Sequence, residues 1–232
     1  GHPLLDYTSG AMSRAEFGRV YQVRESDRIV ALFAGSRPQE LKLVYPILLE
    51  AALRCQCELG NVVIFVSVSA AAFRDAIVAE LPTPLPDYIR LYDGSSYDLM
   101  SAADLSFAPS GTITLEHAIM GKPAVIGYRF NAVSFFLAKL LLGKRLKRIK
   151  YVSLPNILLD RRVMPEFFQD EFTVDNVMAC GLSLLTDSKL YQKTSDDIKS
   201  VRALLGEEGV LSRASEAVLA FMKMKRNNGV HG

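Results

Sequence analysis

A turn in the middle of the chain carries residue types that bind phosphate. Ser110, Gly111 and Thr112 follow a short apolar run and precede apolar residues at helical spacing. The free N–H groups of a helix start, two hydroxyls and a glycine that allows close approach suit an anion. Glu116 lies about 9 Å further along such a helix, a span that fits a nucleotide with its diphosphate on the turn and its ribose on the carboxylate. The alternative is that Ser110 caps an ordinary helix and Glu116 is a solvated acid.

A second turn of this kind comes earlier in the chain. Gly35, Ser36 and Arg37 stand between an apolar strand and a helix that Pro38 can begin. A guanidinium binds phosphate through two parallel hydrogen bonds, so this turn is another candidate anion site. A capped helix with an exposed arginine explains the same residues, and the turn alone does not decide between the two.

Both turns occupy equivalent places in an alternating pattern of strands and helices. Strands are predicted at 28–34, 61–68, 88–92, 105–108 and 124–127, with helices at 38–51, 70–80, 97–103 and 110–121. This alternation predicts an α/β fold with a Rossmann-like, doubly wound parallel sheet. Ligands bind at the carboxyl ends of the strands in that architecture, so the two turns together favour a nucleotide or sugar-phosphate site.

The remaining segments divide the chain. Residues 1–26 mix Gly, Pro, Ser and charge, and are predicted to be a linker or hinge with one short helix. Residues 27–205 form the Rossmann-like domain, and residues 206–232 form a C-terminal helix and tail. Within these, 151–158 is predicted to be extended around Pro155 and 161–169 to be a short helix, followed by helices at 174–186, 189–205 and 210–225.

Composition excludes several classes of protein. Half of the 232 residues are hydrophobic, enough for a substantial core, and a net charge of +2 argues against nucleic acid as a general partner. The three cysteines lack the spacing of a zinc site or a disulfide framework, which fits a reducing compartment.

The apolar segment that begins at residue 132 is too short to span a bilayer, but it leads into a basic cluster, so 132–150 is a candidate lipid contact. A buried helix followed by a solvated basic loop is the alternative.

A set of short motifs runs along nearly the whole chain. They are residues 1–4 (GHPL), 35–37 (GSR) with Glu40, 103–104 (AD), 110–116 (SGTITLE), 127–129 (GYR), 151–158 (YVSLPNIL), 163–169 (VMPEFFQ), and 205–209 (LGEEG) with Ala214 and Ala217. In this combination the chain resembles lipid-A-disaccharide synthases, glycosyltransferases of the two-domain GT-B type. The resemblance implies that this is the C-terminal, UDP-sugar-binding half, and that a further Rossmann-like domain belongs ahead of residue 1.

The resemblance also implies an activity. The family transfers 2,3-diacylglucosamine from UDP to 2,3-diacylglucosamine 1-phosphate in β(1→6) linkage, with inversion, release of UDP, and neither metal nor cofactor. Its proposed general base is an Asp of the domain that is absent here, so this chain is expected to be inactive alone. Expected partners are UDP and UDP-2,3-diacylglucosamine, the absent domain, the lipid substrates and the membrane surface through 132–150, with a homodimer left open. The expected location is the cytoplasmic face of the inner membrane.

Site residues follow from the same resemblance. Diphosphate binding is assigned to Ser36, Arg37, Ser110, Gly111 and Thr112, and ribose binding to Glu116; Gly35 is expected to belong to the same UDP-sugar site. Arg129 and Asn156 are expected to line the donor pocket, with Arg37 and Asn156 supporting the leaving group. Two rival functions stay open: a nucleotide-binding or lipid-surface module without transferase activity, and an enzyme of similar fold that uses another UDP-sugar, such as a UDP-N-acetylglucosamine epimerase.

Overall fold

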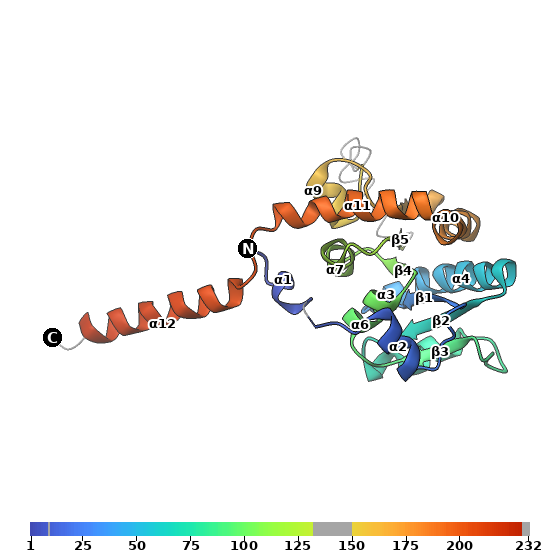
Figure 1. Cartoon of the computed structure of the whole chain (residues 1–232), viewed down its shortest axis with the longest axis horizontal. Helices are drawn as coiled ribbons and strands as arrows, with labels where there is room; N and C mark the ends of the chain where they lie inside the picture. The colour runs from blue at the N-terminus through green and yellow to red at the C-terminus, as the bar shows by residue number, and fades with distance from the viewer. Residues whose placement is uncertain (9, 132–149, 229–232) are drawn as a thin grey trace.

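Six strands form one parallel sheet in the structure, a computed structural model that describes residues 1–8, 10–131 and 150–228 (Figure 1). The strands are β1 (Arg28–Phe33), β2 (Val62–Ser67), β3 (Ile89–Tyr92), β4 (Leu105–Pro109), β5 (Ala124–Tyr128) and β6 (Glu166–Phe168), in the order β3-β2-β1-β4-β5-β6. The chain direction across the sheet reverses between β1 and β4, the switch point at which doubly wound sheets bind ligands. The predicted Rossmann-like fold is confirmed.

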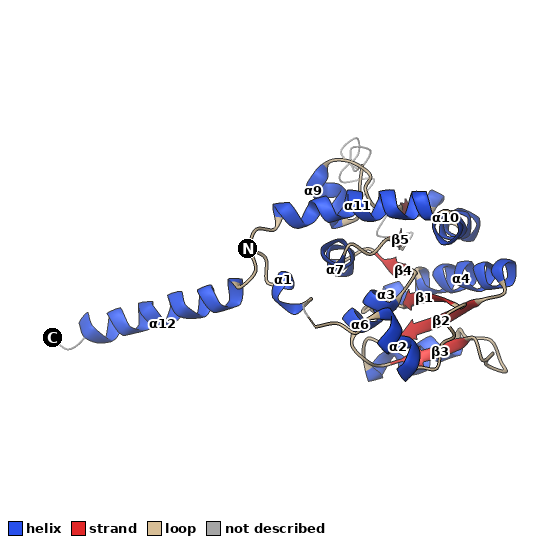
Figure 2. Ribbon diagram, in the orientation of Figure 1, coloured by secondary structure: helices blue, strands red, loops and turns tan. Residues whose placement is uncertain are grey.

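Helices cover both faces of this sheet (Figure 2). They are α1 (Leu4–Tyr7), α2 (Arg14–Val20), α3 (Pro38–Leu43), α4 (Tyr45–Leu59), α5 (Arg74–Ala79), α6 (Ser96–Ala102), α7 (Thr112–Met120), α9 (Leu154–Leu159), α10 (Val174–Thr186), α11 (Ser188–Leu204) and α12 (Val210–Asn228). Short 3₁₀ turns occupy Ala71–Phe73 and Gln169–Glu171.

The central strand β1 shows why its sequence is apolar throughout. Ile29, Ala31 and Phe33 point into the core cluster that includes residues of α2, α6 and α7, whereas Val30 and Leu32 point into the cluster that includes residues of α4 and α10. Successive side chains of a strand face opposite sides, so a strand covered on both faces needs apolar residues at every position.

The N-terminal segment contains two helices rather than one, and it packs against the sheet. Phe17 of α2 is fully buried, and its ring lies 5.1 Å from the ring of Phe65 and 5.6 Å from that of Tyr92. Leu5 of α1 belongs to the same core cluster. These contacts attach residues of the predicted linker to the Rossmann-like unit; the proposed domain boundaries themselves stay a prediction.

Three element predictions were wrong in detail. The helix predicted over 38–51 is divided into α3 and α4, because Pro46 lies in the first turn of α4 and has no N–H to continue α3. Residues 151–158, predicted to be extended, contain α9, whose first turn accommodates Pro155. Residues 161–169, predicted to be a helix, contain β6, which pairs with β5 at the edge of the sheet. The pairing of β5 with β6 depends on tertiary contact, so the local sequence pattern does not predict it.

The last helix, α12, extends away from the sheet and its covering helices (Figure 1). Its start is held by Asp6, whose carboxylate accepts hydrogen bonds from the backbone N–H groups of Leu211 at 3.1 Å and Gly209 at 2.5 Å. Those bonds lower the pKa of Asp6. Several large apolar side chains of α12 are exposed, including Phe221 and Met222. No helix within the described residues combines the length and apolarity that crossing a membrane would require.

The predicted lipid-contact segment 132–150 lies outside the described residues except for its last residue. Lys150 forms an ion pair with Asp160 at 3.6 Å.

We predict that Phe17→Ala lowers the free energy of unfolding by about 3–5 kcal/mol, because a buried aromatic ring is replaced by a cavity. Urea denaturation followed by circular dichroism measures this. Val20→Ala is the matched control, since Val20 lies on the same helix and is 59% exposed, and it should change stability by less than about 0.5 kcal/mol. Equal effects of the two substitutions would contradict a core role for α2.

Candidate functional site

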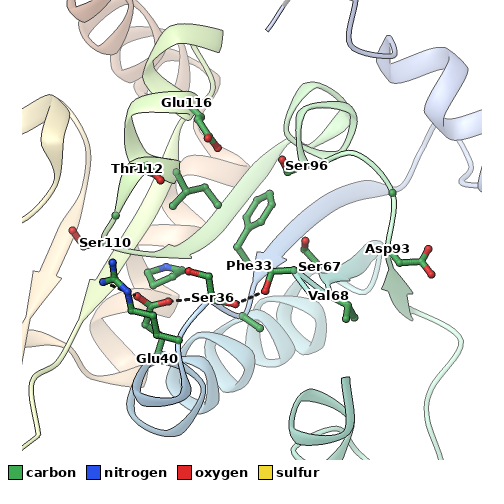
Figure 3. Close-up of a pocket in the computed structure, with 18 residues that line it drawn as sticks. Phe33, Ser36, Glu40, Ser67, Val68, Asp93, Ser96, Ser110, Thr112 and Glu116 are labelled. Carbon is green, nitrogen blue, oxygen red and sulfur yellow. Dashed lines mark hydrogen bonds and ion pairs between the residues drawn. The ribbon is translucent and has the colours of Figure 1, made fainter. Parts of the chain in front are cut away.

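A cavity of about 390 Å³ opens at the carboxyl edge of the sheet (Figure 3). The last residues of β1, β2 and β4 line it, as do the segments that follow β1, β2, β3 and β4. Both predicted turns, 35–37 and 110–112, are among the lining segments. The expectation that they meet at one edge of the sheet is therefore met.

The turn after β1 has an unusual backbone. Gly35 has a φ of +109°, in the region that favours glycine, and its carbonyl accepts a hydrogen bond from the Ser69 hydroxyl at 2.8 Å. The Arg37 side chain is 72% exposed, and its one ion pair within the described residues is a long one, 3.7 Å, with Glu40. Such an arginine is free to turn toward an anion in the cavity.

The turn after β4 leads into a helix that is capped by no side chain of the described residues. The Ser110 hydroxyl donates to the carbonyl of Val152 at 2.6 Å, and Gly111, at the N-cap position of α7, has no side chain to offer. The first N–H groups of α7 thus lack the side-chain acceptor that usually satisfies such groups. The alternative in which Ser110 caps the helix is wrong, and the start of α7 is suited to an external anion.

Glu116 lies on the cavity side of α7 (Figure 3). The Tyr97 hydroxyl approaches its Oε1 atom at 3.5 Å. Burial raises the pKa of Glu116, and the contact with Tyr97 opposes that shift. The carboxylate is therefore half-buried in the wall of the cavity rather than a fully solvated acid.

The opposite wall of the cavity was not predicted from the sequence. It contains Ser67, Asp93 and Ser96, which Figure 3 labels, and also Ser69. Each lies near the end of a predicted strand or in the segment that follows one. The rule that assigned 35–37 and 110–112 to the carboxyl edge could have found these residues too, but they form no anion-binding pattern on their own.

His117, next to Glu116 in sequence, lies in the core rather than in the cavity wall. It is fully buried, one ring nitrogen lies 2.8 Å from the carbonyl of Ile113, and burial lowers its pKa to about 4. The imidazole is consequently neutral near pH 7. The described residues contain no group of three or more His, Cys, Asp or Glu side chains placed to hold a metal ion.

Comparison with known proteins decides the family. A family model described as lipid-A-disaccharide synthetase matches residues 1–221. The chain belongs to the lipid-A-disaccharide synthase family. The synthase of Sulfurihydrogenibium sp. (strain YO3AOP1) is 31% identical over 96% of this chain, which spans 58% of that protein's length.

Solved structures support the fold of this family member. The C-terminal domain of the group 1 glycosyltransferase LpcC from Francisella tularensis matches 88% of this chain and 97% of that domain, with a TM-score of 0.59 and 12% identity. A co-structure of S. aureus MnaA with UDP matches 95% of this chain and 52% of that protein, with a TM-score of 0.58 and 14% identity. At such identities the likeness concerns the fold alone, a Rossmann-like half of the GT-B type.

Two of the residues assigned from the synthase motifs do not line the cavity. One is Asn156, which is fully buried. Its amide donates to the carbonyl of Met164 at 2.8 Å and accepts from the N–H groups of Val163 and Met164 at 2.7 and 2.8 Å. In this structure Asn156 orders the loop that precedes β6, the role that an asparagine between apolar neighbours commonly has.

The other is Arg129, at the end of β5. Its guanidinium donates to the carbonyls of Phe172 at 2.6 Å and Gln169 at 3.2 Å, and lies 5.6 Å from the ring centre of Phe172. These contacts tie the residues after β6 to the sheet. The seven other predicted residues, 35–37, 110–112 and Glu116, all line the cavity.

We predict that Glu116→Gln raises the stability of the folded chain at neutral pH. A raised pKa in the folded state means that stability falls as pH rises from the unfolded value, about 4.3, through the folded one. A glutamine does not ionise, so the variant should exceed wild type at pH 7.5 and equal it at about pH 4, as urea titrations across this range would measure. Glu58→Gln, at an exposed acid, is the control. A variant no more stable than wild type at pH 7.5 would contradict the proposed burial of Glu116.

Proposed function

We propose that this chain is the UDP-sugar-binding half of a lipid-A-disaccharide synthase. The observation that carries the proposal is the meeting of residues 35–37 and 110–116 around one cavity at the switch point of the sheet. The proposed reaction is the one that the family resemblance implies: transfer of 2,3-diacylglucosamine from UDP to 2,3-diacylglucosamine 1-phosphate, with a β(1→6) bond formed and UDP released.

The diphosphate is assigned to the start of α7 and to Arg37. Unsatisfied N–H groups and the positive end of the helix dipole stabilise an anion there, and the glycine at position 111 has nothing within 4 Å of where a side chain would begin. The ribose hydroxyls are assigned to Glu116, one turn further along the same helix, because a carboxylate accepts hydrogen bonds from vicinal hydroxyls.

In the reaction the 6-hydroxyl oxygen of the acceptor attacks the anomeric carbon of the donor as the bond to the diphosphate breaks. The bonding electron pair leaves with UDP, and the acceptor proton passes to a base. In this proposal no metal is used, so Arg37 and the N–H groups of α7 stabilise the charge that develops on the departing diphosphate. The base is assigned to the domain that this chain does not include, and attack from the far side inverts the anomeric centre.

The same proposal covers the partners of the enzyme and its location in the cell. Both substrates carry acyl chains, so the enzyme would act at the cytoplasmic face of the inner membrane, with 132–150 as the lipid contact. A homodimer stays open. Nucleic acid is not proposed as a partner.

We predict that UDP raises the melting temperature of the chain. At a concentration about 100-fold above Kd, binding stabilises by about 2.7 kcal/mol, or about 5–10 °C for a chain of this size. Glu116→Ala should abolish most of the shift without lowering the ligand-free melting temperature, whereas Glu50→Ala should keep it. A folded wild-type sample that does not respond to UDP would count decisively against the site.

Disaccharide formation separates a transferase from a binding module. The chain alone should give no product from UDP-2,3-diacylglucosamine and 2,3-diacylglucosamine 1-phosphate, and the polypeptide that includes the preceding domain should give the disaccharide.

Competition against UDP by acylated and plain UDP-sugars tests the remaining alternative, that the enzyme uses a different donor. Stronger competition by a plain UDP-sugar would favour that alternative.

A further inference from the structure

Glu40 is an acid with almost no access to solvent beneath the proposed diphosphate site. It lies in the first turn of α3, is 6% exposed, and is one of the residues that line the cavity. Burying a carboxylate costs desolvation free energy unless hydrogen bonds or an opposite charge compensate it, and its negative charge opposes the binding of an anion nearby. The contacts of the Glu40 oxygens therefore indicate the role of this side chain.

Both oxygens of Glu40 are directed to the turn after β1. Oε2 accepts a hydrogen bond from the Ser36 N–H at 2.8 Å, and Oε1 lies 3.7 Å from a guanidinium nitrogen of Arg37. Figure 3 shows Ser36 and Glu40 next to each other at one end of the cavity. The carboxylate thus contacts the two residues of this turn that carry the donors.

Gly35 is shaped around the same side chain. A Cβ atom at Gly35 would lie 2.6 Å from the Cβ and 2.7 Å from the Oε2 of Glu40, closer than real contacts allow. The positive φ of Gly35 and the absence of its side chain let the turn wrap closely over Glu40. Glu40 thus accepts the Ser36 N–H, lies close to Arg37, and has Gly35 wrapped against it.

We propose that Glu40 is a positioning residue of the donor site, which holds residues 35–37 in the conformation that receives the diphosphate and does not itself contact the ligand. This inference rests on the proposed UDP site. Fixing the turn before the ligand arrives removes an ordering cost from binding. The long ion pair with an exposed Arg37 leaves that guanidinium free to move to the ligand.

Three variants of the chain test this. Glu40→Gln keeps an oxygen that accepts the Ser36 N–H, Glu40→Ala removes it, and Gln39→Ala alters an exposed neighbour on α3. Isothermal titration with UDP should show that Glu40→Ala weakens binding about tenfold or more, the scale of a hydrogen bond to a charged group. Glu40→Gln should stay within about threefold of wild type, and Gln39→Ala should match it.

Amide hydrogen exchange at Ser36 gives a readout that does not depend on UDP. The Ser36 N–H should be protected in wild type and in Glu40→Gln, and should exchange rapidly in Glu40→Ala. If the amide stays protected in Glu40→Ala, or if Glu40→Ala binds UDP as tightly as wild type, the inference is wrong. If the exchange pattern holds but wild type does not bind UDP, the proposed function fails while the positioning of the turn by Glu40 stands.

Discussion

The parallel pairing of β1 with β4 is the constraint on which the site depends. Val30 pairs with Leu105 and Leu32 with Phe107, so the two strands end side by side although their sequences are far apart. Each strand is followed by a turn and a helix, and the connections leave to opposite sides of the sheet at this point. Residues 35–37 and 110–112 thereby face one cavity, and neither turn alone would enclose a ligand.

The hydrogen-bond donors and the acids of that cavity have different places in the proposed site. The described donors for an anion are the N–H groups at the start of α7 and the exposed guanidinium of Arg37, both at the end where the strands stop. Two of the three acids that line the cavity, Glu40 and Glu116, have separate tasks in the proposed site. Glu40 is engaged by the turn it supports, and Glu116 stands one turn along α7, beside Tyr97. An acid directly at the start of α7 would instead occupy the place of the ligand.

Hydrogen bonds join the N-terminal segment to the start of α12. Asp6 of α1 caps the start of α12, although about 200 residues separate them. Phe17 of α2, in contrast, is buried among aromatic rings above the sheet. The N-terminal segment is thus anchored at one point by the hydrophobic core and at another by hydrogen bonds.

The sequence by itself determined strands β1 to β5, their order along the chain and the two turns, because apolar runs, glycine and proline act over a few residues. It also indicated the family, because the short motifs that carry the resemblance can be identified in the sequence alone. Only the tertiary structure decided which motif residues reach the cavity. Asn156 and Arg129 belong to two of those motifs, yet they donate to the backbone around β6, a strand that exists because β5 offers a free edge. The serines and Asp93 of the far wall gain their place in the same way, since proximity across a sheet depends on pairing and register, which local spacing does not encode.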